Sequence, residues 1–102
     1  MAAPPYSVVP TESFLHTVLS LAASPANRIR LKKIRKTQRL LAEQGPAYPG
    51  LNTHQIQNRT GPHGEPVYQS YVENRAPSAW RMWWMYGPRE DQIMLLDAGP
   101  HL

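Results

Sequence analysis

The sequence predicts an α+β fold in which two N-terminal helices pack on one face of a small antiparallel β-sheet. Apolar residues recur with helical spacing in the first half of the chain, and strand-like runs fill the second half. Glycine and proline pairs punctuate the chain between these segments. At 102 residues the chain has room for one modest core, so we expect a single domain over residues 1–102.

The N-terminal part predicts a short strand followed by a first helix. Tyr6 to Val9 is β-prone and ends at Pro10. Thr11 is a suitable cap for a helix that runs to about Ala22. Five apolar residues of this helix are expected to share one buried face: Phe14, Leu15, Val18, Leu19 and Ala22.

A second helix is expected after Ser24-Pro25, because a hydroxyl cap followed by proline is a helix start signal. It should end near Gln44, where Gly45-Pro46 stops it. Its buried stripe is narrow, so the helix is expected to lie on the domain surface. The stripe comprises Ile34 and Leu41, together with Ile29 or Leu31.

Four strands are expected in the rest of the chain. A hairpin joins residues 53–57 to residues 67–73 through a long glycine- and proline-rich turn at residues 60–66. The third strand spans residues 80–86 and the fourth spans residues 93–98. The hairpin and the last two strands complete the predicted sheet.

The second helix carries the most concentrated charge of the chain. Seven cations and no acid lie between residues 28 and 39, and the pI is near 9.8. Such a pattern indicates a polyanion or an acidic protein as partner, although a solvated helix face explains it equally well. The cations are Arg28, Arg30, Lys32, Lys33, Arg35, Lys36 and Arg39.

The third strand contains all three tryptophans of the protein and one arginine. Side chains alternate along a strand, so Arg81 and Trp83 share the face opposite Trp80. If the helices cover the Trp80 face, a cation and an indole line the open face, which suits a phosphate and a base. In the alternative, both faces are core and Arg81 pairs with Asp97 or Glu73.

Several classes of protein are excluded or disfavoured by composition. The chain has no cysteine, so it has no disulfide and no thiolate metal site. Its histidines lack the spacing of a metal site, and we expect no metal and no cofactor. The N-terminus has no apolar signal-peptide core, and no apolar run is long enough to span a membrane. The expected location is the cytoplasm, without membrane association.

The chain resembles the RelE/ParE toxin superfamily over nearly its whole length. The resemblance rests on five ordered segments after the basic helix: residues 49–51, 53–54, 67–72, 79–84 and 95–101. It implies a toxin of a bacterial toxin–antitoxin pair, with a cognate antitoxin as partner. Many members are metal-independent endoribonucleases that cleave mRNA on the ribosome and so inhibit translation. The ParE branch inhibits DNA gyrase instead.

The resemblance also implies roles for individual residues. Trp80-Arg81 fits the aromatic–arginine pair at the start of the third strand of RelE-like nucleases. Gly99-Pro100-His101 fits the small-residue turn after their last strand, which is followed by histidine, arginine or tyrosine. Arg81 would then offset phosphate charge, while His101 and His54 would serve as general acid and base, with their order open.

The remaining implied roles concern RNA binding. Arg59 would contact phosphate, Trp83 and Tyr71 would stack on bases, and the basic helix would bind ribosomal RNA or the antitoxin through Lys32, Lys33 and Lys36. RelE members carry lysines where this chain has Gln69 and Tyr71, so its charge arrangement differs. HigB- and YoeB-like members use histidine and acidic groups, for which His54, Glu65 and His101 are candidates.

Three functions therefore remain open. They are an mRNA-cleaving toxin, a gyrase-directed toxin that needs no acid–base pair, and a member without catalytic activity that binds nucleic acid or a protein. The histidine at position 101 favours the first, because an inhibitor of gyrase has no need of it.

Overall fold

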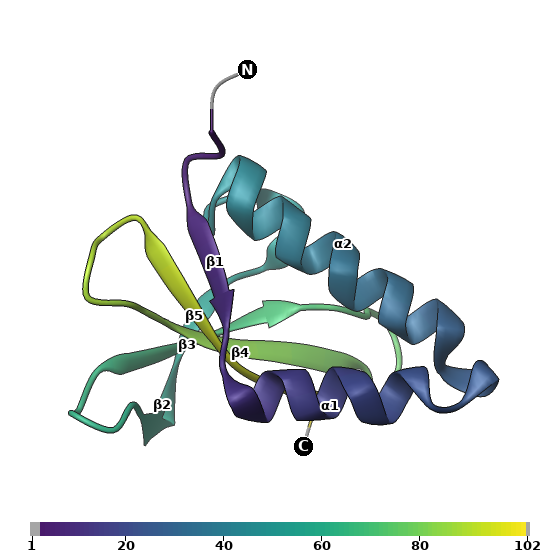
Figure 1. Ribbon diagram of the computed structural model, residues 1–102. Coiled ribbons are helices and arrows are strands. Elements are labelled where there is room, and N and C mark those ends of the chain that lie inside the picture. The colour runs from purple at the N-terminus through teal and green to yellow at the C-terminus, as the bar shows by residue number, and fades with distance from the viewer. Residues whose placement is uncertain (1–2, 102) are drawn as a thin grey trace.

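The computed structural model describes residues 3–101, and within that range a five-stranded sheet packs with two helices (Figure 1). The helices are α1 (Glu12–Ala22) and α2 (Arg28–Gln44), and short 3₁₀ turns lie at Pro25–Asn27 and Pro49–Leu51. The strand order across the sheet is β1-β5-β4-β3-β2. The strands are β1 (Ser7–Pro10), β2 (His54–Thr60), β3 (Pro66–Tyr71), β4 (Trp80–Tyr86) and β5 (Gln92–Pro100).

The sheet is mixed, so the prediction of an antiparallel sheet is wrong for β1. This strand runs parallel to β5, with Ser7 opposite Gln92 and Pro10 opposite Leu95, whereas the other neighbours are antiparallel. Parallel neighbours need a long crossover connection. Both helices and the other strands lie between β1 and β5 in the chain, which provides that connection.

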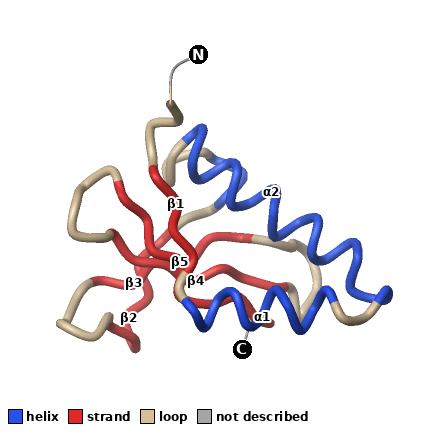
Figure 2. Tube along the Cα trace, in the orientation of Figure 1, coloured by secondary structure: helices blue, strands red, loops and turns tan. Residues whose placement is uncertain are grey.

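The position of the helices also differs in part from the prediction. Helix α1 packs against β5 and β1, and α2 packs against β1 and α1. Both helices therefore lie toward the β1–β5 side of the sheet, and the β2–β3 turn extends on the other side of the molecule (Figure 2). The helix-and-sheet architecture is as predicted, but the helices do not cover one whole face evenly.

One apolar core joins the helices to the sheet. From β4 it takes Met82 and Trp84, which share a strand face and are fully buried. The other members come from both helices, the 3₁₀ turn before β2, and β5: Phe14, Leu21, Ile34, Leu41, Leu51, Ile93, Leu95 and Ala98. Trp84 is the largest fully buried side chain, and Tyr68 stacks on it with ring centroids 4.9 Å apart.

Helix α1 has the predicted bounds but a different buried face. Thr11 caps it as expected, since its hydroxyl oxygen accepts a hydrogen bond from the Phe14 N–H. Phe14 and Leu21 are buried, whereas Leu15 and Leu19 are 48% and 69% exposed. Six of the eleven residues of this helix are apolar, which leaves several possible apolar stripes on so short a helix. The hydroxyl of Thr11 also donates to the Leu95 carbonyl (2.7 Å), which ties the start of α1 to β5.

Helix α2 buries Ile34, Thr37 and Leu41, while Ile29 is 69% exposed. Thr37 is a polar residue at a buried position. Its hydroxyl lies within hydrogen-bonding distance of the Lys33 carbonyl (3.0 Å) and the Tyr71 carbonyl (3.3 Å), so the buried polar group is satisfied. The helix ends at the predicted glycine. Gly45 has a φ of +82°, and a Cβ on it would lie 2.9 Å from the Tyr6 ring.

Among the described residues, no helix has both the length and the apolar character needed to cross a membrane.

Candidate functional site

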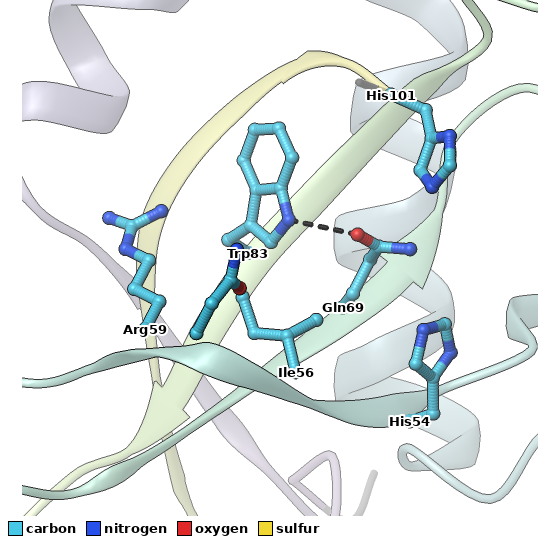
Figure 3. A pocket seen from close by; sticks show the side chains of 7 residues that line it. His54, Ile56, Arg59, Gln69, Trp83 and His101 are labelled. Atoms are coloured by element: carbon cyan, nitrogen blue, oxygen red, sulfur yellow. Dashed lines mark hydrogen bonds between the residues drawn. The ribbon is translucent and has the colours of Figure 1, made fainter.

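A cavity of about 470 Å³ lies on the side of β4 opposite the core (Figure 3). Met82 and Trp84 point into the core, so strand alternation directs Trp83 to the other face. There the cavity is lined by residues from β2, β3 and β4 and by the residue after β5: His54, Ile56, Asn58, Arg59, Gln69, Trp83 and His101. We call it the histidine cavity. Four of the predicted site residues meet there.

The floor of the histidine cavity is a row of side chains on three neighbouring strands. His54 lies opposite Gln69 in the β2–β3 register, and Gln69 lies opposite Trp83 in the β3–β4 register. The indole Nε1 of Trp83 donates a hydrogen bond of 3.0 Å to the Gln69 amide oxygen. Gln69 is 5% exposed, so this bond is largely shielded from water. The row therefore holds the indole in a fixed orientation.

Gly99 fixes the other end of the same indole. A Cβ at this position would lie 3.2 Å from Cζ3 of Trp83, so the six-membered ring lies closely over the glycine backbone. This approach is possible because glycine has no side chain. The resemblance implies a small-residue turn before His101, but Gly99 and Pro100 belong to β5, and Gly99 makes room for Trp83.

His54 has a defined hydrogen-bonding state. Its Nδ1 lies 3.1 Å from the carbonyl oxygen of Asn52. A carbonyl oxygen only accepts, so Nδ1 carries the proton. In the neutral imidazole the proton is then absent from Nε2, which is free to accept a proton. His54 is exposed at the cavity rim and is suited to act as a base.

His101 is held at the opposite rim by its backbone. Its N–H donates to the Ala79 carbonyl at 2.8 Å, directly after Pro100 pairs with Trp80. This bond continues the β4–β5 ladder past the end of β5. The two imidazole rings lie on either side of the Gln69 amide group in Figure 3. The exposed ring of His101 is available to a molecule in the cavity.

Arg81 does not line the histidine cavity. It is 7% exposed, and its guanidinium lies over the Tyr71 ring with Cζ 3.6 Å from the centroid. Its Nη1 donates to the carbonyls of Glu73 (2.6 Å) and Trp80 (3.2 Å), while its buried Nε has no partner among the described residues. Arg81 lies opposite Tyr71 of β3 and opposite Gly99 of β5 in the strand register. Its row of residues is therefore the neighbour of the row that contains Gln69 and Trp83 on the same face of the sheet.

The two acids considered as partners of Arg81 have other contacts. The Glu73 carboxylate binds the guanidinium of Arg30 at 3.1 and 3.4 Å and accepts the Trp80 N–H at 3.0 Å. Partial burial opposes its ionisation, but these hydrogen bonds and the Arg30 charge lower the pKa of Glu73 overall. The Asp97 carboxylate accepts from Thr17 of α1 at 2.8 Å.

Glu65 lies outside the histidine cavity. Its carboxylate accepts the His63 N–H at 2.6 Å in the β2–β3 turn. Hydrogen bonds from its own backbone N–H and from that of His63 lower the pKa of Glu65. It therefore stabilises the turn, and no acidic side chain is found among the described residues that line the cavity.

The predicted lysines lie on α2, away from the histidine cavity. Lys32, Lys33 and Lys36 are exposed, and all three line a shallow outer groove on that helix. Tyr71 lies beneath Arg81 and is not part of the cavity lining. Within residues 3–101, no group of three or more histidine or acidic side chains is placed to hold a metal ion.

Sequence reasoning missed three lining residues, namely Ile56, Asn58 and Gln69. Gln69 was noted only as a departure from the lysines of RelE. Its alternation with Tyr68 and Ser70 already placed it on the same strand face as Tyr71. Strand alternation and the position of Gln69 opposite Trp83 in the β3–β4 register together identify Gln69 as the residue that orients the indole.

The fold is similar to that of known toxin structures. RelE of Pyrococcus horikoshii, in its complex with RelB, has a TM-score of 0.64 and 11% identity over 94% of both chains. YafQ of E. coli has a TM-score of 0.65 and 14% identity, covering 94% of this chain and 93% of YafQ. YafQ in the DinJ–YafQ toxin–antitoxin complex gives the same score and identity, over 95% and 93% of the two chains.

No protein-family model matches the sequence, and no curated protein matches it either. Identities of 11% and 14% show the fold alone. The element order, the mixed sheet and the extent of the structural match together lead to one conclusion: this chain has the fold of the RelE and YafQ toxins.

Proposed function

We propose that this protein is the toxin of a toxin–antitoxin pair and acts as a metal-independent endoribonuclease that cleaves mRNA on the ribosome. The observation that carries the proposal is the meeting of His54 and His101 at one cavity that also contains Arg59 and Trp83. Two imidazoles, which can donate or accept a proton, together with a cation and an aromatic ring are suited to cleave RNA.

The reaction begins with a proton transfer to His54. Nε2 of His54 accepts the proton of an RNA 2′-hydroxyl, because Nδ1 already carries a proton donated to Asn52. The 2′-oxygen then forms a bond to the adjacent phosphorus, and the bond from phosphorus to the 5′-oxygen breaks. The protonated His101 gives its proton to that leaving oxygen. The products are a 2′,3′-cyclic phosphate and a 5′-hydroxyl.

Positive charge and stacking support this step. Arg59 lines the histidine cavity, on the other side of Trp83 from the two histidines in Figure 3, and its proposed role is to bind a phosphate of the RNA strand. Arg81 adds a fixed positive charge one register row away. Trp83, held by Gln69 and Gly99, offers a rigid surface on which a base can stack.

The partner we propose is an antitoxin with an acidic segment that covers basic residues of α2, among them Lys32, Lys33 and Lys36. Complementary charge favours such a contact and speeds its formation. The solved structures of similar fold include two complexes, RelE–RelB and DinJ–YafQ, and this supports a protein partner.

Induced expression in bacteria, followed by primer extension on cellular mRNA, tests the proposal. Wild type should arrest growth and produce new mRNA ends, whereas His101→Ala and His54→Ala should lose both effects by about 100-fold or more. His63→Ala is the matched control, because that histidine lies in the β2–β3 turn outside the cavity lining. It should behave as wild type.

Two results would contradict the proposed nuclease activity. Growth arrest by wild type without new mRNA ends, unchanged in His101→Ala, would favour the gyrase-directed alternative. Soluble, folded wild type without toxicity would favour a binding protein without catalytic activity.

A further inference from the structure

The side-chain amide of Gln69 has two ends with different surroundings. Its oxygen accepts the indole N–H of Trp83 at 3.0 Å. An indole N–H only donates, so the atom that faces it is the amide oxygen, and the NH₂ group lies at the other end of the amide. The indole therefore determines which way the amide is turned.

The NH₂ group of this amide opens into the histidine cavity. Gln69 lines the cavity although it is only 5% exposed. Within residues 3–101 its Nε2 has no hydrogen-bond partner, and Nε2 is not among the side-chain atoms that are buried without one. In Figure 3 this nitrogen points away from Trp83, toward the side on which the rings of His54 and His101 lie. Two N–H donors are thus free to bind a molecule in the cavity.

The place of this group between the two histidines indicates which ligand atom it meets. In the proposed reaction, the attacking 2′-oxygen and the leaving 5′-oxygen lie on opposite sides of the phosphorus atom. The base and the acid therefore lie on opposite sides of the phosphate, and a group between them faces its non-bridging oxygens. The Gln69 amide has this place, because it lies opposite His54 in the β2–β3 register and between the two rings in Figure 3.

The two arginines near the histidine cavity do not supply this contact. Arg59 lies on the other side of Trp83 from the histidines in Figure 3. Arg81 does not line the cavity, and its Nη1 donates to two backbone carbonyls. The amide of Gln69 is therefore the donor that lies between the acid and the base.

We propose that Gln69 is a catalytic residue, whose amide nitrogen donates a hydrogen bond to a non-bridging oxygen of the cleaved phosphate. This inference rests on the proposed nuclease function and adds to it the group that stabilises the charge on the phosphate. The proton stays on the amide throughout, so the proton transfers by His54 and His101 are unchanged. Trp83 acts as a positioning residue for the amide. A donor that is already oriented in a largely buried position stabilises developing charge without reorganising.

Gln69→Glu separates this role from that of holding the indole. A carboxylate oxygen still accepts the Trp83 N–H, but the NH₂ group is lost. On programmed ribosomes we expect kcat for mRNA cleavage to fall about 100-fold or more. Gln55→Glu is the matched control, because Gln55 is an exposed residue of β2 outside the cavity lining. It should cleave at the wild-type rate.

A phosphorothioate at the cleaved position tests the contact with the phosphate directly. Sulfur accepts hydrogen bonds more weakly than oxygen. Wild type should therefore cleave one of the two diastereomers about tenfold more slowly than the other. Trp83→Phe should keep most of this preference, because the amide is still present. Trp83→Phe/Gln69→Leu should lose it, and this pair leaves no indole N–H without an acceptor, which favours folding.

A wild-type kcat in Gln69→Glu would overturn the assignment of Gln69. So would a diastereomer preference that is the same in Trp83→Phe and in the folded double variant. In both cases cleavage by wild type leaves the nuclease itself in place. Absence of cleavage by wild type would refute the nuclease and this inference together.

Discussion

At the scale of single residues, the site depends on how Gln69 and Gly99 hold Trp83. The amide oxygen accepts the indole N–H, and the glycine leaves room for the six-membered ring. Neither residue transfers a proton in the proposed reaction, yet both determine the orientation of the indole. Their role could be found only by combining strand alternation with the register between β3 and β4.

Gln69→Leu should leave the indole N–H of Trp83 without its acceptor in a largely buried position. We expect a loss of about 1–3 kcal/mol in the free energy of unfolding, measured by urea denaturation. Trp83→Phe removes the donor, so the double variant should lose less than the sum of the two single variants. Strictly additive losses would contradict a direct interaction between these side chains.

The site residues differ in how far the sequence could predict them. His54, Arg59, Trp83 and His101 were predicted and meet at the histidine cavity. Arg81 was expected beside Trp83 on the open face, and alternation does place it there. Its burial matches the alternative in which Arg81 is buried beside Glu73, but the contact is with the backbone carbonyl of Glu73 and not with its carboxylate, and the sequence does not predict the path of that loop.

At the scale of elements, Glu73 joins α2 to the start of β4. Its carboxylate binds Arg30 of α2 and the Trp80 N–H, and the Arg30 guanidinium lies 4.8 Å from the Trp80 ring centroid. The backbone carbonyl of the same residue holds Arg81. One loop residue thus connects the basic helix with Arg81, which lies one register row from the floor of the histidine cavity.

The lowered pKa of Glu73 predicts a pH-dependent stability. A carboxylate with a folded-state pKa below its unfolded value stabilises the fold above that unfolded value, near 4.5, and loses this contribution as pH falls through the folded-state pKa. Glu73→Gln should therefore be less stable than wild type at pH 7. The difference should shrink as pH falls below about 4.5.

Urea denaturation across pH 3–7 measures this difference. Glu43→Gln, at an exposed position near the end of α2, is the control and should follow the wild-type curve. A gap between Glu73→Gln and wild type that stays constant with pH would show that the ion pair with Arg30 does not carry the effect.

The two helices show where periodicity fails to define a face. In α1, the positions at residues 15 and 19 fit a helical stripe as well as those at residues 14 and 21 do, but only the latter reach β5 and the core. Which stripe is buried depends on how the helix approaches the sheet, and spacing carries no information about that approach.

Substitution distinguishes the two stripes directly. Leu21→Ala should lower the free energy of unfolding by about 2–5 kcal/mol, since it empties a buried position. Leu19→Ala removes the same atoms from a side chain that is 69% exposed and should change it by less than about 0.5 kcal/mol. Similar losses in thermal or urea denaturation would mean that α1 packs with a different face.

At the scale of the whole molecule, the sequence predicted the α+β class and the order of the elements, but not the direction of β1. The four residues of β1 can pair with either edge in either direction, and only the path through both helices places it beside β5. The resulting sheet separates two surfaces. The histidine cavity lies on the side of β4 opposite the core, and the cations lie along α2.

This separation suits a molecule that binds RNA or an antitoxin with one surface and acts on RNA with another. Arg81, Tyr71 and Glu73 lie between the two surfaces and connect them by direct contacts. The central claim is that His54 and His101 form an acid–base pair. This claim concerns the protonation of two imidazole rings, so the pH dependence of the cleavage rate tests it.

The most direct measurement is the pH dependence of mRNA cleavage on programmed ribosomes by wild type, His54→Ala and His101→Ala. Wild type should give a bell-shaped profile, rising as the base loses its proton and falling as the acid loses its own. His54→Ala should cleave far more slowly and lack the rise, and His101→Ala should lack the fall. Profiles that keep both limbs in both variants would contradict the assignment of these two histidines.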